Sequence, residues 1–257
     1  LAVPFMFTSI LGTKEAIKPP PAQKFHAKDM VQLFTKNPPL LIVSMAFLIY
    51  GFLNYGRMTV GMYYFTYVWG NPTATGIVTA VAAFFSIYLV RLFKGKRGAL
   101  LVSYFVSIIL NAILYFLTPE RSTATVVMVI LLSTAVTNGA ITALLYGIIG
   151  DTADYGQWKI GLRADGLCSS GTSFMLKFGG ALAPTMLLSM LAASGYVANS
   201  PQQTAGALGS MNIVMNLVPA ILAAIGFVLF LFYKLDENLH GKIISELKAR
   251  GDYLVEE

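Results

Sequence analysis

Residues 146–180 read YGIIGDTADYGQWKIGLRADGLCSSGTSFMLKFGG. The first part of this stretch is polar and carries the charged side chains Asp151, Asp154, Lys159, Arg163 and Asp165. Long apolar segments lie on both sides of it, and a further charge, Lys177, lies inside the second of them. Because a charge at membrane depth is energetically costly, it usually has a function. The stretch therefore predicts two membrane helices joined by a polar hinge, with Lys177 as the first candidate functional residue.

The whole chain has the composition of a membrane protein. Of its 257 residues, 56% are hydrophobic and 12% are charged, against roughly 25% charged in an average soluble domain. Six apolar segments are long enough to cross a membrane. They are residues 40–64, 74–93, 99–117, 123–149, 166–194 and 208–233. Their uniform apolarity favours helices over the alternating strands of a barrel, so we expect an all-α membrane protein with six transmembrane helices.

The basic residues are distributed very unevenly between the two sides of the membrane. If the helices alternate in direction, all Lys and Arg residues except Arg57, Arg121 and Lys177 lie on one side. Arg121 lies on the other side, and the remaining two lie inside helices. Because positive residues concentrate in cytoplasmic loops, we expect a multi-pass protein of the cell membrane with its basic side in the cytoplasm. The same distribution argues against a nucleic-acid-binding protein.

The segments outside the spans indicate half of a larger transporter. Residues 1–11 are apolar but too short to span, so we interpret them as the end of a preceding transmembrane helix. Residues 12–39 are rich in Pro and Lys and predict a cytoplasmic linker. Residues 40–233 form the predicted six-helix bundle, and residues 234–257 form a cytoplasmic tail. This order suits the second half of a twelve-helix transporter built from two six-helix repeats.

Three predicted helices carry polar side chains at helical spacing. The fifth span has Asp165, Ser169, Ser173 and Lys177, with Thr172 beside them. The first span has Tyr50, Asn54, Arg57, Gly61 and Tyr64, and the fourth has Thr134, Asn138, Thr142 and Tyr146. Residues three or four apart share a helix face, so the strips could surround a water-filled cavity. Hydroxyl, amide, aromatic and cationic groups there would suit a polyhydroxylated ligand.

The alternative interpretation is that small polar residues only let membrane helices pack closely. We favour it for polar residues of the third and sixth spans, namely Ser103, Ser107, Asn111, Asn212 and Asn216. For Lys177 we favour a cavity or coupling role, because a desolvated ammonium would otherwise need a purely structural partner. Arg57 admits both interpretations, a cavity residue or a brace that binds a carbonyl or an anionic partner.

The hinge from Asp151 to Asp165 admits three interpretations. Asp151 and Asp154 are one turn apart, which could juxtapose carboxylates for acid–base work or metal binding, although the GxGD motif of intramembrane aspartyl proteases is absent. Alternatively, these carboxylates pair with Lys159 and Arg163 at the cytoplasmic helix ends and hold one conformation of a transporter. The third interpretation is a plain solvated loop.

Residues suited to covalent or metal chemistry are few. Cys168 is the single cysteine, so an internal disulfide is excluded. His26 and His240 both fall outside the apolar segments, which excludes a histidine-based centre within the membrane. We therefore expect no enzyme, no catalytic residues, no metal site and no cofactor.

These stretches resemble the signature of the glycoside-pentoside-hexuronide:cation symporters, the melibiose permease group of the major facilitator superfamily. The resemblance covers nearly the whole chain, as the C-terminal half of such a protein. Its strongest parts are DTADYGQWKIGLRADG at 151–166, KFGG at 177–180 and GYVAN at 195–199. The stretch YYFTYVWGN at 63–71 and the tail YKLDENLHGKIISEL at 233–247 also fit.

The resemblance implies sugar uptake coupled to sodium or protons by alternating access. Lys177 matches the family's eleventh-helix lysine near the sugar and the coupling cation, and Arg163 matches its loop arginine beside that helix. Thr172 and Ser173 match cavity-facing positions. Thr142 stands where the family's melibiose permease has tryptophan, and Thr172 where it has a longer amide, which argues against melibiose as the substrate.

The resemblance also implies that the coupling-cation carboxylates and most sugar-reading residues lie in six N-terminal helices that this chain lacks. The expected partners are a sugar, a coupling cation, the lipid bilayer and that missing half. The expected substrate and coupling residues are Lys177, Ser173, Thr172, Arg57, Asn54, Tyr64, Asn138 and Thr142. The expected cytoplasmic gate is Asp151, Asp154, Lys159, Arg163 and Asp165. The alternatives are a transport-inactive membrane sugar sensor with the same fold and a self-contained six-helix protein that works as a dimer.

Overall fold

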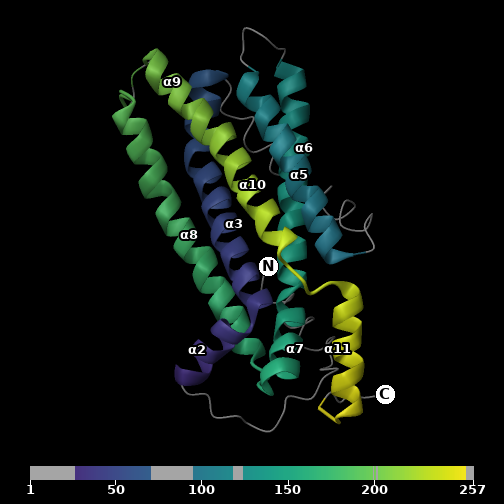
Figure 1. Cartoon of the computed structure of the whole chain (residues 1–257). Helices are drawn as coiled ribbons and strands as arrows, with labels where there is room; N and C mark the ends of the chain where they lie inside the picture. The colour runs from purple at the N-terminus through teal and green to yellow at the C-terminus, as the bar shows by residue number, and fades with distance from the viewer. Residues whose placement is uncertain (1–26, 71–94, 118–123, 199, 201, 253–257) are drawn as a thin grey trace, which may run out of the picture.

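The computed structural model describes residues 27–70, 95–117, 124–198, 200 and 202–252, and these form helices and short connections without a strand (Figure 1). The elements are α2 (Ala27–Lys36), α3 (Pro38–Tyr63), the π-helix η1 (Tyr64–Val68), α5 (Lys96–Phe116), α6 (Ala124–Gly147), α7 (Ile149–Ile160), α8 (Asp165–Ala193), α9 (Ala205–Asn212), the π-helix η2 (Ile213–Leu217), α10 (Val218–Leu231) and α11 (Glu237–Ala249). The predicted span 74–93, the predicted helix end 1–11 and residues 12–26 of the predicted linker lie outside the described residues.

Five described helical stretches are long and apolar enough to cross a membrane. They are Pro38–Val68, Lys96–Phe116, Val127–Ile160, Asp165–Ala193 and Ala205–Leu231. They coincide with five of the six predicted spans, and the prediction of an all-α membrane protein is confirmed. The α8 span is the least buried of the five.

The first of these spans begins earlier than predicted, at Pro38 instead of Leu40. Asn37 caps the helix, since its side-chain oxygen accepts a hydrogen bond from the Leu40 N–H at 3.0 Å. Proline suits the first turn of a helix because its missing N–H would have no partner there. The end of the predicted linker is likewise helical, because α2 occupies Ala27–Lys36.

The predicted hinge is largely a helix, so its interpretation as a solvated loop is wrong. A break at Ile148 separates α6 from α7, which then continues to Ile160. Gly161 ends it with a positive φ of 74° and donates its N–H to the Gln157 carbonyl at 2.9 Å. The physical reason is burial, because Asp154 and Gln157 of α7 lie inside the structure.

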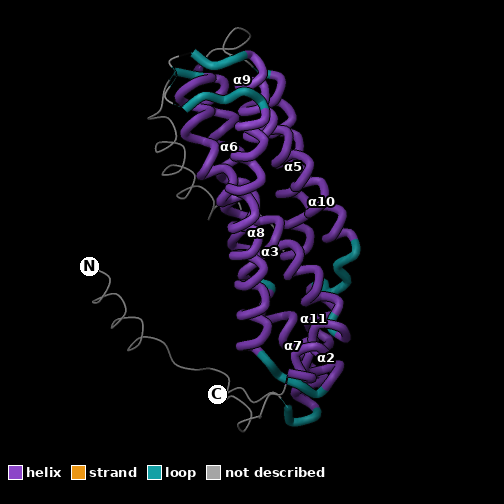
Figure 2. The backbone as a smooth tube through the Cα atoms, turned by 90° about the vertical axis from the view of Figure 1, so that its left-hand side faces the viewer, coloured by secondary structure: helices purple, strands orange, loops and turns teal. Residues whose placement is uncertain are grey.

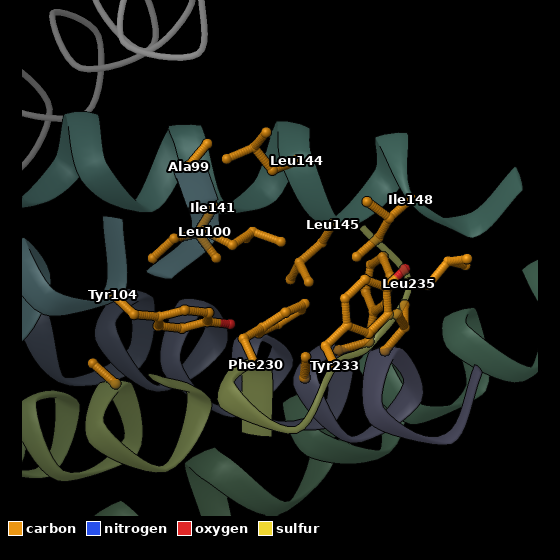
Figure 3. Packing of buried hydrophobic residues seen from close by; sticks show 14 of the residues in the cluster. Ala99, Leu100, Tyr104, Ile141, Leu144, Leu145, Ile148, Phe230, Tyr233 and Leu235 are labelled. Atoms are coloured by element: carbon orange, nitrogen blue, oxygen red, sulfur yellow. The ribbon is translucent and has the colours of Figure 1, made fainter. Parts of the chain in front are cut away.

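The arrangement of the helices separates two ends of the bundle. Along most of its length α8 lies beside α3, while α2, α7 and α11 gather at one end (Figures 1 and 2). We call this end, which carries Lys96, Lys159, Arg163 and His240, the basic end. Figure 3 shows the core where α5, α6 and the end of α10 meet. There the Phe230 ring lies 5.9 Å from the Tyr104 ring and 5.4 Å from the Tyr233 ring.

Two glycines let the backbones of α3 and α8 approach closely. A Cβ added to Gly51 would lie 2.1 Å from the Leu176 carbonyl oxygen, and one added to Gly179 would lie 2.1 Å from that of Leu48. Small residues at such positions are typical of close helix packing in membranes. The contact sets which face of α8 is covered, and it leaves Lys177 on the exposed face.

Candidate functional site

The polar strip of α8 lies on one exposed face of that helix. Ser169, Ser173 and Lys177 are all exposed, and so is Asp165 in the first turn. The rings of Phe174 and Phe178 stack beside the strip at 6.0 Å and are also exposed. The structure thus brings together the strip that the four-residue spacing predicts.

Thr172 lies on a different side of α8 from Ser173, contrary to the expectation that both face a cavity. It is buried, and its hydroxyl donates to the carbonyl oxygens of Cys168 and Ser169, at 3.0 Å each. Neighbouring residues on a helix are rotated by about 100°, so only one of the two can lie at the centre of the exposed face. The covered face of α8 includes Thr172.

The strip predicted on α3 divides between the surface and the interior. Asn54 is exposed. Arg57 points to other helices, because its guanidinium donates to Asn111 Oδ1 on α5 and to the Met215 carbonyl oxygen of η2 at 3.4 Å. Asn111 is itself held by Ser107, whose carbonyl oxygen accepts from its Nδ2 at 2.7 Å. This geometry matches the bracing interpretation of Arg57, with a carbonyl as one partner.

Tyr64 also lies in the interior and is fully buried. Its hydroxyl accepts a hydrogen bond from Asn216 Nδ2 at 3.1 Å, which joins the π-helices η1 and η2. Asn216 also donates to Asn212 Oδ1 at 2.7 Å, and Asn212 donates to the Tyr115 carbonyl oxygen at 2.9 Å. These contacts agree with the interpretation of Asn212 and Asn216 as packing residues. They do not agree with the expectation that Tyr64 contacts a ligand.

The α6 strip is partly accessible. Asn138 and Thr142 are half-buried, and Thr142 donates to the Asn138 carbonyl oxygen at 2.7 Å. Thr134 is fully buried, and Tyr146 is 51% exposed with its ring edge against Phe47. Asn138 and Thr142 therefore remain available to a ligand, and Thr134 belongs to the packed interior.

The basic end contains a chain of ion pairs centred on α7. Arg163 Nη1 lies 2.9 Å from Asp154 Oδ1, and Arg163 Nε lies 2.8 Å from Asp165 Oδ2. Lys96, at the start of α5, donates to both carboxylate oxygens of Asp151 at 2.8 Å. Arg163 also donates to Gln157 Oε1 at 2.9 Å. Each predicted carboxylate of the hinge thus faces a cation, as the ion-pair interpretation requires.

Lys159 is placed differently from the other expected gate residues. It is exposed, and its ammonium lies 5.6 Å from the ring centroid of Trp158. The neighbouring Trp158 Nε1 donates to Glu246 Oε2 on α11 at 2.7 Å. Of the two expected gate cations, Arg163 therefore provides the contacts to Asp154 of α7 and Asp165 of α8.

Sequence reasoning missed two members of the ion-pair chain, Lys96 and His240. His240 Nε2 lies 3.0 Å from Asp154 Oδ2 and 3.8 Å from Asp151 Oδ1. The hydrogen bond to Asp154, followed by the charge of Asp151, raises the pKa of His240 above its ordinary value, against burial and the charge of Lys96. The sequence signal that could have pointed to His240 was the tail stretch 233–247, which fits the family signature. That stretch does not show where the tail docks.

Among the described residues, no group of three or more His, Cys, Asp or Glu side chains has the geometry of a metal site. Asp151 and Asp154, the pair considered for acid–base or metal chemistry, are instead held by Lys96 and Arg163. These ion pairs can hold the ends of α5, α7 and α8 together electrostatically.

Comparison with known proteins identifies the family. The model of the MFS/sugar transport protein family matches residues 1–237. The chain belongs to this family. As a member of this family it is a multi-pass membrane protein and not an enzyme, as the sequence predicts.

Several curated proteins are similar to this MFS chain. A symporter of Bacillus subtilis, YnaJ, described as uncharacterized, is 28% identical over 89% of the chain and 50% of its own length. An isoprimeverose transporter of Lactiplantibacillus pentosus is 26% identical over 97% of the chain and 53% of its own length. A putative sulfoquinovose importer of Escherichia coli is 33% identical over 43% of the chain and 24% of its own length. The chain spans about half of the length of the first two relatives.

Proposed function

We propose that the chain is the C-terminal half of a secondary transporter that couples uptake of a sugar to a sodium or proton gradient by alternating access. The observation that carries the proposal is the exposed strip of α8, which runs from Asp165 through Ser169 and Ser173 to Lys177 inside a membrane-spanning helix. A cation exposed on such a helix is costly in hydrocarbon and suits a water-filled cavity. The names of the relatives, an isoprimeverose transporter and a sulfoquinovose importer, support a sugar as the ligand.

In this proposal the ligand contacts of the chain are Lys177 and Ser173 of α8, Asn54 of α3, and Asn138 and Thr142 of α6. All five are exposed or half-buried. Their hydroxyl and amide groups can donate and accept hydrogen bonds, as recognition of sugar hydroxyls requires. Arg57, Tyr64 and Thr172 act behind this surface, because their polar atoms bond to neighbouring helices or to their own backbone.

The proposed gate is the ion-pair chain of the basic end, which we place on the cytoplasmic side. It links the start of α5 through Lys96, α7 through Asp151 and Asp154, and the start of α8 through Asp165. Such pairs hold one arrangement of packed helices and must break for another to form. The missing N-terminal half completes both the cavity and the gate.

The test is uptake by vesicles that contain the full-length protein. We expect a neutral glycoside, a pentoside or a hexuronide to accumulate only under an inward sodium or proton gradient, and an ionophore that collapses the gradient to abolish accumulation. A ligand that binds without counterflow would identify the sensor alternative. The absence of gradient-dependent uptake for all three sugar classes would refute the proposal.

A further inference from the structure

The tail helix α11 docks on α7 through both apolar and polar contacts. Ile243 and Leu247 of α11 are fully buried. Glu246 accepts from Trp158 Nε1, and the Asp252 carbonyl oxygen just beyond the helix accepts from Gln157 Nε2 at 2.8 Å. The tail is therefore a structural part of the basic end.

His240 lies at the point where α11 meets the ion-pair chain. Its Nε2 is 3.0 Å from Asp154 Oδ2 and 3.8 Å from Asp151 Oδ1, so one imidazole faces two carboxylates of α7. The opposing charge on a neighbouring element is Lys96 of α5, which holds Asp151 at 2.8 Å. Arg163 holds the other oxygen of Asp154 at 2.9 Å. The side chain of His240 is 25% exposed, so protons from solvent can reach it.

We propose that His240 is a positioning residue of the gate, which clamps α11 to α7 when it is protonated and loosens that contact when it loses its proton to solvent. A protonated imidazole donates a charge-assisted hydrogen bond to Asp154 and attracts Asp151. A neutral imidazole can still donate one hydrogen bond to the Asp154 carboxylate, but it no longer carries the positive charge that attracts both Asp154 and Asp151. Histidine is the side chain whose charge ordinarily changes near physiological pH.

The direction of the pH dependence follows from the environment of His240. The hydrogen bond to Asp154 raises the pKa of the docked imidazole above the 6.5 of a free one. The contribution of His240 to docking is therefore fully present below pH 6.5 and is lost as the pH rises through the raised value. Alkalinisation on the side of the basic end releases the clamp, and acidification restores it.

The experiment measures docking directly in the full-length protein, without transport. Spin labels are attached at Gly150→Cys on α7 and Ser245→Cys on α11, and their distance distribution is recorded from about pH 5.5 to about pH 8.5. Both positions are exposed, and a Cβ at Gly150 meets no neighbour within 4 Å. Cys168 is buried and can stay in place. We expect one short distance at low pH and a growing longer component at high pH, with the ratio rising by at most about tenfold per pH unit.

The variant His240→Gln keeps a neutral donor but cannot titrate, so we expect its distance distribution to be independent of pH. His26→Gln removes the other histidine of the chain and should follow the unmodified protein. A distribution that is constant with pH in the unmodified protein overturns the proposal. So does an unchanged pH response in His240→Gln. Because docking is measured without a sugar or a gradient, these outcomes are separate from any failure of the proposed transport.

Discussion

At the scale of single residues, Lys177 and Arg57 show that two cations in membrane-spanning helices can have different surroundings. Lys177 is exposed on the polar face of α8. Arg57 donates hydrogen bonds to Asn111 of α5 and to the Met215 carbonyl oxygen of η2. The first position suits contact with a ligand, and the second suits bracing of three helical segments. We therefore expect substitution of Lys177 to affect transport and substitution of Arg57 to affect stability.

For Lys177→Ala we expect normal membrane expression and thermal stability but loss of gradient-driven sugar accumulation. The exposed ammonium can be removed without leaving a buried partner unpaired. The measurement is uptake in vesicles beside a melting curve in detergent, with Lys242→Ala as the control, because Lys242 is 70% exposed on α11. Uptake equal to that of the unmodified protein would contradict the proposed role of Lys177.

For Arg57→Met we expect lower stability, by about 1–3 kcal/mol, because buried acceptors lose their donor. The measurement is thermal unfolding in detergent. In a double-mutant cycle with Asn111→Ala, the two losses should not add, since the residues share one hydrogen bond. Unchanged stability together with weakened sugar binding would place Arg57 in the ligand site instead.

At the scale of helices, the contact between α3 and α8 depends on the absence of side chains at two positions. Gly51 and Gly179 each face a carbonyl oxygen of the opposite helix. Backbone atoms cannot move aside as the end of a flexible side chain can. This contact fixes the rotation of α8 and thereby the direction of Lys177.

We expect Gly179→Ala to destabilise the protein by about 1–3 kcal/mol, the usual cost of overpacking. Gly166→Ala, on the same helix, should change the stability by less than about 0.5 kcal/mol, because its Cβ meets nothing within 4 Å. Melting temperatures of the two variants in the same detergent provide the comparison. Equal stability of the two variants would show that α3 and α8 can separate without cost.

At the scale of the whole molecule, two observations agree with a helical bundle that functions together with a second bundle. They are the exposed face of α8 and the fraction of the relatives' length that this chain matches. The α8 span is the least buried of the five described spans, and the chain covers about half of the length of the YnaJ and isoprimeverose relatives. In the proposed transporter, the other six-helix half faces this strip.

We expect the chain expressed alone to enter the membrane but to accumulate no sugar, because the proposed cavity and coupling site need both halves. Co-expression with the remainder of the gene product as a separate chain should restore gradient-dependent uptake. Uptake by both preparations is measured in vesicles. Transport by this chain alone would favour the self-contained dimer over the half-transporter.

Much of the fold could be predicted from the sequence, but less of the candidate site could. The spacing of Ser169, Ser173 and Lys177 correctly placed them on one exposed face. The same reasoning placed Tyr64 with Asn54, although Tyr64 is fully buried and bonds to Asn216 whereas Asn54 is exposed. Spacing shows which residues share a face, but it does not show what that face contacts.

The basic end illustrates the same limit over longer distances in the sequence. Asp151 and Asp154 were recognised as ion-pair candidates, whereas Lys96 and His240 were not. Lys96 lies 55 residues before Asp151, and His240 lies 86 residues after Asp154. From charge alone, several other exposed cations would have been equally good candidates to pair with these carboxylates. Only the docking of α11 shows that His240 is the one that lies beside them.

The sequence by itself determined the family resemblance, the order and approximate positions of the five spans that the structure describes and the uneven distribution of basic residues. These properties depend on local composition, because transfer into hydrocarbon is decided segment by segment. Only the tertiary structure decided that Arg57 and Tyr64 brace the interior, that Thr172 is covered and that the tail closes on α7. Those outcomes depend on how helices distant in the sequence pack, since each buried polar group must find its partner on whichever neighbour lies against it.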